Sequence, residues 1–202
     1  MTNFGSDFWD ERYNQERFLY GQNPNQFFKS QIVKLNPGKL FFPGDGDGRN
    51  SVYAASSGWQ VDAVDFSPVA IEKSKLLSKS FNVTVNFKLA DLTKFVPKPN
   101  FYNAAAVIFV HLPPQFRKVF HKNIADCLTN GGIVIFEVYE KKQLGKNSGG
   151  PQNEEMLYSV AEIQNDFNNI NTLYLQDEIV KLNESEKHSG PANVIRYVGQ
   201  KK

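Results

Sequence analysis

The chain alternates short apolar runs with amphipathic segments, and this alternation constrains its fold more than any other feature. Residues 104–109, AAAVIF, are uniformly apolar, as in a strand buried on both faces of a sheet. The segment after the two prolines at 113–114 carries apolar residues every four positions, as a helix does. Comparable strand and helix patterns repeat along the sequence. The alternation predicts a parallel sheet covered by helices on both faces.

Turn and capping residues mark the expected element boundaries. Strands are expected at 39–42, 59–65, 85–89, 104–109, 133–139, about 172–182 and 192–199. Helices are expected at about 24–35 (with Asn23 and Pro24 at its start), 49–57, 68–81, from 114 to the glycines at 131–132, and from the capping-box pair Ser159 and Glu162 onward. A turn formed by Asn183, Ser189, Gly190 and Pro191 predicts a hairpin. The predicted fold class is α/β, a Rossmann-like, doubly wound, mostly parallel seven-stranded sheet with an antiparallel C-terminal hairpin strand.

Length and composition fit one ordinary globular domain. The chain has 202 residues, of which 41% are hydrophobic and 22% charged. We expect a single domain over 1–202, with an N-terminal cap or lid segment at 1–36 and a core at 37–202. The loosest stretch, 140–156, is expected to be an active-site loop or a mobile connection.

Charge and cysteine usage narrow the partners. The net charge is only +2, and no run of Lys and Arg is longer than a pair such as 201–202, which argues against a nucleic-acid partner. The single Cys127 cannot form an intrachain disulfide, and this fits a reducing compartment. The N-terminus has no signal-peptide core, and the longest apolar run, 104–110, is too short to span a membrane. We therefore expect a cytoplasmic protein without a membrane partner.

Residues 41–50, FFPGDGDGRN, are the most informative stretch. Three glycines and two aspartates follow the first predicted strand, at an end where such sheets bind ligands. A tight turn that binds nothing is the alternative, since a glycine motif by itself is a weak signal. Asp65 ends the next strand, where a carboxylate can accept hydrogen bonds from both ribose hydroxyls of an adenosine. A carboxylate that serves only the helix start at Ser67 is the alternative for Asp65.

The aspartates bias the choice of cofactor. A dinucleotide would place its pyrophosphate beside Asp45 and Asp47, where like charges repel. S-adenosylmethionine instead carries a sulfonium and an ammonium, which an acidic loop attracts. Arg49 offsets one carboxylate, so an NAD-type cofactor stays open. After the third strand, Asp91 is placed to accept from an adenine amino group and Leu92 to offer its backbone N–H, although Asp91 is equally suited to cap a turn.

Several segments resemble a known family. FFPGDGDGRN, VDAVDFSPVAI and ADLTKF resemble the three cofactor segments of class I S-adenosylmethionine-dependent methyltransferases. The narrower resemblance, to the tellurite-resistance and thiopurine methyltransferase-like group, is carried by FWDERY (8–13), YGQNPNQFF (20–28), HLPPQFRKVF (111–120), GGP (149–151) and HSGPANVIRYVGQKK (188–202). The resemblance spans nearly the whole chain. It implies methyl transfer from S-adenosylmethionine.

The resemblance also implies roles for individual residues. The cofactor would be held by Gly44, Gly46 and Gly48 under its methionine and ribose, Asp65 at the ribose, Phe66, Asp91 and Leu92 at the adenine, Val110 and His111 near the methyl group, and Tyr13 and Tyr20 in a segment that closes over it. One position departs from the family, because Phe42 stands where an acid usually precedes the first glycine. We hypothesise that Asp45 replaces that acid near the methionine end.

The sequence constrains the methyl acceptor less than it constrains the cofactor. A thiol or other soft nucleophile needs no strong base, whereas an oxygen or amine acceptor usually does. We take His111, His188 and Arg196 as candidate catalytic residues; for His188, it is the family resemblance that implies an active-site histidine. The alternatives are a helix-start histidine for His111 and a solvated hairpin histidine for His188. Arg196 is either an anion-binding group or a solvent-facing partner of an acid. His121 is expected on a helix surface, and no metal site is expected. The sequence HLPP after the fourth strand and the helical Cys127 argue against nucleobase methylation, so a small-molecule acceptor is favoured.

Two other functions stay open at this point. One is a non-catalytic protein that binds an adenosine-containing ligand on the same fold, which Phe42 favours. The other is an NAD-type oxidoreductase, which the acidic loop and its G-x-G-x-G spacing disfavour.

Overall fold

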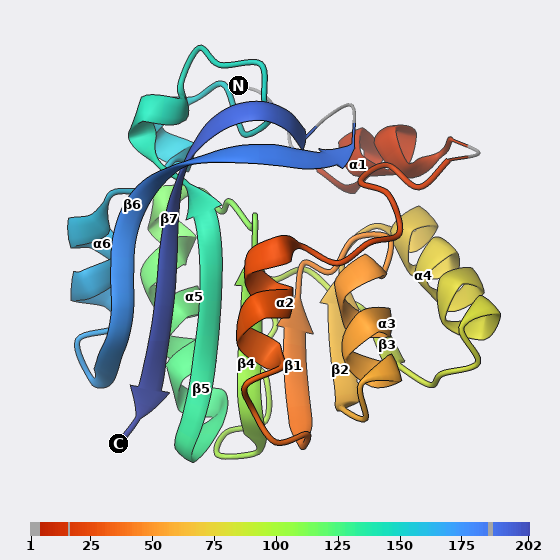
Figure 1. Cartoon of the computed structure of the whole chain (residues 1–202), viewed down its shortest axis with the longest axis horizontal. Coiled ribbons are helices and arrows are strands. Elements are labelled where there is room, and N and C mark those ends of the chain that lie inside the picture. The colour runs from red at the N-terminus through yellow and green to blue at the C-terminus, as the bar shows by residue number, and fades with distance from the viewer. Residues whose placement is uncertain (1–4, 16, 186–187) are drawn as a thin grey trace.

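A seven-stranded sheet forms the centre of the molecule, with strand order β3-β2-β1-β4-β5-β7-β6 (Figure 1). The computed structural model describes residues 5–15, 17–185 and 188–202. The strands are β1 (Lys39–Pro43), β2 (Gln60–Asp65), β3 (Asn86–Leu89), β4 (Tyr102–Ile108), β5 (Leu128–Tyr139), β6 (Ile170–Ser185) and β7 (His188–Lys201). The first five pair in parallel, and β7 runs antiparallel between β5 and β6. The predicted fold class is confirmed.

Helices cover both faces of this sheet. They are α1 (Ser6–Tyr13), α2 (Gln26–Ile32), α3 (Arg49–Ser56), α4 (Pro68–Ser80), α5 (Pro114–Cys127) and α6 (Val160–Asp166), with short 3-10 turns η1 (Lys141–Gln143) and η2 (Glu154–Met156). Neighbouring strand residues face opposite sides. Phe42 therefore packs with α2 and α3, whereas Phe41 packs in the cluster that α5 and α6 cover. The strand order reverses beside β1, so the carboxyl ends of β1 and β4 diverge there and leave room for a ligand.

Helix α2 begins later than the sequence indicated. Asn25, rather than Asn23, caps it, because the Asn25 side chain accepts a hydrogen bond from the Phe28 backbone N–H at 2.8 Å. The helix ends at Ile32 and not near residue 35. Helix α1, for which the mostly polar segment gave no assignment, packs against α4 through its apolar residues.

The C-terminal half contains two further boundary corrections. Helix α5 ends at Cys127, and β5 starts at Leu128, well before the glycines expected to stop the helix. Tyr102 of β4 pairs with Leu128, and this pairing makes the chain a strand from Leu128 onward. Ser189, Gly190 and Pro191, expected in a turn, lie within β7, because β6 and β7 pair as far as Ser185 and His188.

His121 is not on a surface, and this prediction was wrong. Its side chain is fully buried, stacked on Phe167 with ring centroids 5.1 Å apart. The Nδ1 atom pairs with Asp166 at 2.7 Å. Helix α6 covers this side of α5, a contact that the helical spacing of α5 could not reveal.

A buried polar chain ties the start of α2 to the far strands. Asn25 Nδ2 donates to Glu137 at 2.5 Å, and Glu137 accepts from Arg196 Nε at 2.7 Å. Arg196 also pairs with Glu178 on the edge strand β6 at 3.0 Å. Glu137 has no exposed surface, so its charge depends on these donors.

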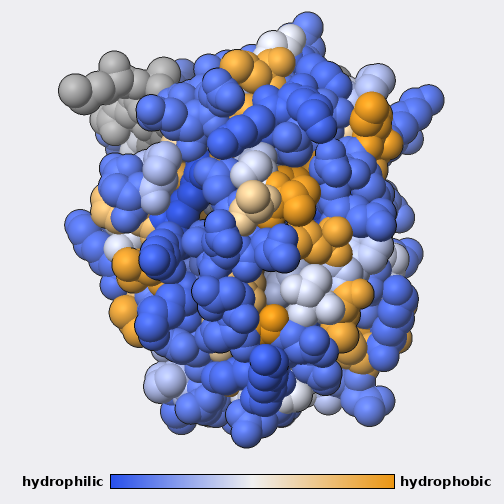
Figure 2. Space-filling view, turned by 90° about the vertical axis from the view of Figure 1, so that its left-hand side faces the viewer, coloured by the Kyte–Doolittle hydropathy of each residue, from blue (hydrophilic) through white to orange (hydrophobic). Residues whose placement is uncertain are grey.

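The outer face at β6 and α6 is mostly hydrophilic (Figure 2). Hydrophobic side chains occur there as separate patches, and exposed ones on β6 include Leu173, Tyr174 and Ile179. None of the helices among the described residues combines the length and the apolar character that a membrane span requires.

Replacing Arg196 with methionine tests this buried polar chain. The variant leaves the buried carboxylate of Glu137 without its cation, so we expect a loss of roughly 3 kcal/mol in the free energy of unfolding, measured by urea denaturation. Lys142→Met is the control, since it breaks an exposed pair with Asp177 and should leave stability nearly unchanged. Equal losses in the two variants would show that the buried pair has no special role.

Candidate functional site

A cavity of about 1140 Å³ opens at the carboxyl ends of the parallel strands. It is walled by α1, by the loops after β1 to β4, and by residues 146–156 of the connection after β5. Twelve of the predicted site residues line it together, namely Tyr13, Tyr20, Gly44, Asp45, Arg49, Asp65, Phe66, Asp91, Leu92, Val110, His111 and His188. Gly46 and Gly48 lie in the same loop beneath, and Arg196 lies outside the cavity.

The glycine loop needs glycine for its shape. Gly48 has φ of 90°, and a Cβ atom there would come within 2.9 Å of the Ser74 backbone. Gly46 has φ of 66°, and its added Cβ would collide with the Tyr13 hydroxyl. The Ser74 hydroxyl donates to the Gly46 carbonyl at 2.9 Å, which fixes the loop on α4. The result is a tight bend whose surface stays open to a ligand.

Asp65 ties two of the predicted cofactor segments together. Its two carboxylate oxygens accept from the Gly46 and Ser67 backbone N–H groups, each at 2.9 Å. Burial raises the pKa of Asp65, while these backbone donors oppose that shift. Each oxygen keeps a second lone pair, which is what recognition of vicinal ribose hydroxyls requires.

Asp45 and Asp47 complete a cluster of three buried carboxylates. Asp45 accepts from the Ser51 backbone N–H at 3.3 Å and from the Ser51 hydroxyl. Burial raises the pKa of Asp45 to about 7, with neighbouring Asp65 and Asp47 adding to the shift. Asp47 accepts from the Leu19 backbone N–H at 2.9 Å. A cationic ligand relieves the mutual repulsion of such a cluster, so these residues fit the sulfonium and ammonium of S-adenosylmethionine.

Phe42 does not face the cavity. Its ring is fully buried and packs edge-on against Phe28, with centroids 5.3 Å apart. The position at which the family resemblance implies an acid is therefore part of the core here. Asp45, three residues later, does line the cavity.

The two predicted histidines differ in what holds them. His111 Nδ1 bonds to the Met156 carbonyl at 2.8 Å, and its Nε2 accepts from the Tyr139 backbone N–H at 3.3 Å. Burial lowers the pKa of His111 to about 4, so the ring is neutral. Both ring nitrogens thus bond to the backbone, and His111 fastens the connection after β5 to the sheet.

His188 has a carboxylate partner. Its Nδ1 lies 3.2 Å from Glu184, four residues earlier across the hairpin. Glu184 also pairs with Arg49 at 2.8 Å and accepts from Asn25 at 3.0 Å. Asp91, by contrast, accepts from the backbone and hydroxyl of Thr93, so it caps its turn while lining the cavity.

Sequence reasoning missed several cavity or supporting residues. Glu184 gave no signal, because its importance comes from a pairing between strands. Phe109 directly follows β4, and Tyr139 is the last residue of β5. The predicted ligand-binding residues also lie at strand ends, so this position in the sequence could have identified both as cavity residues. Phe109 has φ of 55°, an uncommon left-handed conformation that stacks its ring on Tyr139 with centroids 4.5 Å apart. Arg12 and Lys146 also line the cavity.

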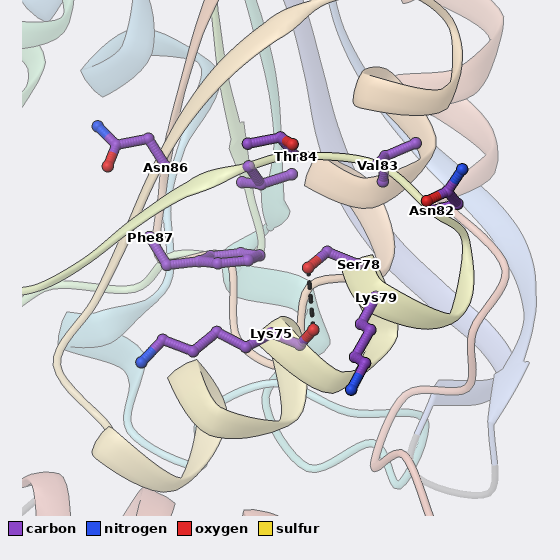
Figure 3. A pocket seen from close by; sticks show the side chains of 9 residues that line it. Lys75, Ser78, Lys79, Asn82, Val83, Thr84, Asn86 and Phe87 are labelled. Atoms are coloured by element: carbon purple, nitrogen blue, oxygen red, sulfur yellow. Dashed lines mark hydrogen bonds between the residues drawn. The ribbon is translucent and has the colours of Figure 1, made fainter.

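A second, more open pocket lies between α4 and β3 (Figure 3). Lys75, Ser78 and Lys79 line it from the helix, and 82–87 line it from the chain entering β3. It lies at the amino end of β3, away from the carboxyl ends of the strands. Among residues 5–15, 17–185 and 188–202, no group of three or more side chains is arranged to hold a metal ion.

Comparison with known proteins relates this fold to the methyltransferases. Residues 43–132 match the family model of the methyltransferase domain. A search of curated protein sequences finds no match.

Solved structures match over nearly the whole chain. TehB from Haemophilus influenzae has 16% identity and a TM-score of 0.72, covering 98% of this chain and 67% of that one. The Burkholderia thailandensis 1,6-didemethyltoxoflavin-N1-methyltransferase, bound to 1,6-didemethyltoxoflavin and S-adenosylhomocysteine, has 15% identity and a TM-score of 0.68, with 98% and 86% coverage. A structure from work on converting a disulfide bond into a thioacetal group in echinomycin biosynthesis has 12% identity and a TM-score of 0.76, with 98% and 90% coverage.

The predicted resemblance to S-adenosylmethionine-dependent methyltransferases is thereby confirmed. The chain carries a methyltransferase-family segment within a Rossmann-like fold that it shares with solved methyltransferase structures.

Titration of Asp45 provides a test of its role in the cavity. A bound cation favours the ionised carboxylate, so affinity for S-adenosylmethionine should rise as the pH increases from 6 to 8 through the Asp45 pKa of about 7. The dependence reaches at most about tenfold per pH unit below that pKa. Asp45→Asn should weaken binding and flatten this dependence, measured by calorimetric titration. An unchanged affinity in the variant would refute the hypothesis that Asp45 replaces the missing acid.

Proposed function

We propose that this protein transfers the methyl group of S-adenosylmethionine to a small-molecule acceptor. The observation that carries the proposal is the acidic glycine loop, whose buried carboxylates Asp45 and Asp47 lie on the cavity wall together with Asp65 at the end of β2. That arrangement suits a cationic nucleoside and disfavours a pyrophosphate. Methyl transfer from a sulfonium mainly needs alignment and a dry site, which a deep cavity of this kind supplies.

The size of the cavity supports a second ligand beside the cofactor. Its volume of about 1140 Å³ exceeds the roughly 300–1,000 Å³ of a site that holds one small molecule. The carboxylates lie after β1 and β2, whereas His111, Tyr139 and His188 lie after β4, on β5 and on β7. The acceptor is therefore assigned to the β4–β5–β7 side.

A thiol or other soft nucleophile remains the predicted acceptor on chemical grounds alone, since such a group needs no base. One structural neighbour comes from work on disulfide conversion to a thioacetal, and another methylates the N1 position of a toxoflavin precursor. These are properties of those proteins. They support a small-molecule acceptor here without selecting its reacting atom.

The closing of segments 1–22 and 140–157 over bound ligands as a lid also remains a prediction, as does a cytoplasmic location. The closing of the two segments is supported by their position at the cavity. Tyr13 and Tyr20 line it from the N-terminal segment, and Met156 lines it from the connection after β5. Lys73 fastens the N-terminal segment to α4 by donating to the Gln15 and Arg17 carbonyls.

A non-catalytic S-adenosylmethionine-binding protein is the second candidate. The observation that favours it is Phe42, which removes an acid that relatives place ahead of the glycine loop. An NAD-type oxidoreductase is a weaker candidate, because its pyrophosphate would face Asp45 and Asp47.

Calorimetric titration with S-adenosylmethionine, S-adenosylhomocysteine and NADH tests the cofactor. We expect micromolar binding of both adenosyl compounds and none of NADH. Asp65→Asn should weaken adenosyl binding about 10- to 100-fold, the size expected for losing hydrogen bonds to a charged group. The matched control is Asp177→Asn, an exposed aspartate on β6. Binding of NADH alone would replace the proposal with the oxidoreductase, and binding of neither would reduce it to a statement about fold.

A further inference from the structure

The pair formed by Glu184 and His188 is arranged as a carboxylate that orients a base. Glu184 is buried, yet hydrogen bonds from His188 and Arg49 outweigh the burial and lower the pKa of Glu184 to about 2. An ionised Glu184 accepts a proton-bearing Nδ1, so the neutral ring of His188 carries its lone pair on Nε2. Burial lowers the pKa of His188, which keeps the ring neutral despite the carboxylate beside it.

Of the two histidines on the cavity wall, only His188 has a ring nitrogen without a hydrogen bond to the described residues. His111 uses both nitrogens on backbone groups, as described above. His188 lines the cavity, and no residue in the described part of the chain hydrogen-bonds its Nε2. A soft acceptor would not require such a base, whereas a hydroxyl would.

Flat aromatic walls surround this base. The Tyr20, Phe109 and Tyr139 rings have centroids 4.3, 4.9 and 5.9 Å from that of His188. Phe109 reaches its place only through the left-handed backbone at its own position. Tyr20 is tilted against the imidazole, whereas Phe109 and Tyr139 meet it edge-on. All three rings also line the cavity, and aromatic side chains at a cavity wall favour a planar ligand.

The cavity wall carries both acidic and basic groups. The carboxylates Asp45, Asp47 and Asp65 gather after β1 and β2, where the cation of the cofactor would bind. Two cations also line the cavity, Arg12 on α1 and Lys146 on the connection after β5, and neither pairs with a carboxylate among the described residues. Their positive charge favours an acceptor that becomes an anion.

Resting on the proposed function, we propose that the acceptor is a planar ring compound with an ionisable hydroxyl, a phenol or an enol, that His188 deprotonates while Glu184 orients the imidazole. The acceptor O–H bond breaks, and its proton moves to Nε2 of His188. The oxygen lone pair forms the bond to the methyl carbon. The carbon–sulfur bond breaks with its electron pair going to sulfur, which leaves the methyl ether and S-adenosylhomocysteine. The proton then passes from His188 to water.

A binding experiment tests the base without turnover. The protein is saturated with S-adenosylhomocysteine, and 4-nitrophenol is titrated by absorbance across pH. In the wild type, we expect the bound dye to ionise at lower pH than free dye, because proton transfer to His188 and the positive charge of Arg12 and Lys146 favour the anion. His188→Gln should reduce that shift. A dye that fails to bind, or that ionises in both proteins as it does in water, would overturn the inference.

Turnover on a series of phenols of increasing acidity gives the second readout. His188→Gln should lose about 10²- to 10⁴-fold in kcat on weakly acidic phenols and far less on phenols already ionised at the assay pH. Glu184→Gln, which affects a positioning residue, should show a smaller loss with the same dependence on acidity. Glu178→Gln is the matched control on the same strand, since Glu178 pairs with Arg196 and lies outside the cavity. A loss that is equal for every phenol would show a merely structural role.

The same assays separate this inference from the proposed function. Methylation of thiols, unaffected by His188→Gln and with no methylation of any phenol, would keep the methyltransferase and overturn the hydroxyl acceptor. Failure of S-adenosylmethionine to bind would remove the proposed function itself.

Discussion

The ion pair between Arg49 and Glu184 is the contact on which the arrangement of this site depends. Arg49 directly follows the glycine loop, and Glu184 lies near the end of β6, so a single 2.8 Å contact joins the first crossover of the sheet to its last hairpin. Arg49 also donates to the backbone carbonyls of Tyr20 and Asn23 at 3.4 Å, while Glu184 holds Asn25 and His188. Both charged side chains are about 95% buried. Because an unpaired charge at that depth is costly, the loop, the N-terminal segment and the hairpin are held in one geometry.

Three buried carboxylates in the cavity impose a second electrostatic constraint. Asp45, Asp47 and Asp65 are all buried, and burial raises the pKa of each. Backbone N–H groups and the Ser51 hydroxyl stabilise these carboxylates only in part. The site is thus built for a positive charge that the protein does not itself supply in full. The hydrogen bonds to these carboxylates explain why an aspartate-rich glycine loop is compatible with a stable fold. The loop is still acidic although Phe42 stands where the family resemblance implies an acid, because Asp45 and Asp47 lie within it.

Much of the fold was predictable because local patterns agreed with the global arrangement. The apolar run at 104–109 became β4, the most central of the predicted buried strands, and the capping box at Ser159 and Glu162 starts α6 as expected. Boundaries failed where a distant partner decided them. Leu128 became a strand because Tyr102 pairs with it, and Ser189 to Pro191 joined β7 because β6 extends opposite them. His121 was misplaced for the same reason, since α6 buries a helix face that the sequence alone left exposed.

The sequence by itself determined the strand and helix order, the glycine loop, and the residues that end the strands, because these follow from spacing and backbone preference within short segments. It therefore named twelve residues that the structure brings together around one cavity. Only the tertiary structure decided which histidine keeps a free nitrogen, that Glu184 stands behind it, and that Arg196 belongs to a buried polar chain instead of the cavity. Those outcomes depend on which side chains meet across strands and on how deeply they are buried. These contacts and this burial are fixed by packing between segments that lie far apart in the sequence. Asn25 and Glu137, for example, are more than a hundred residues apart.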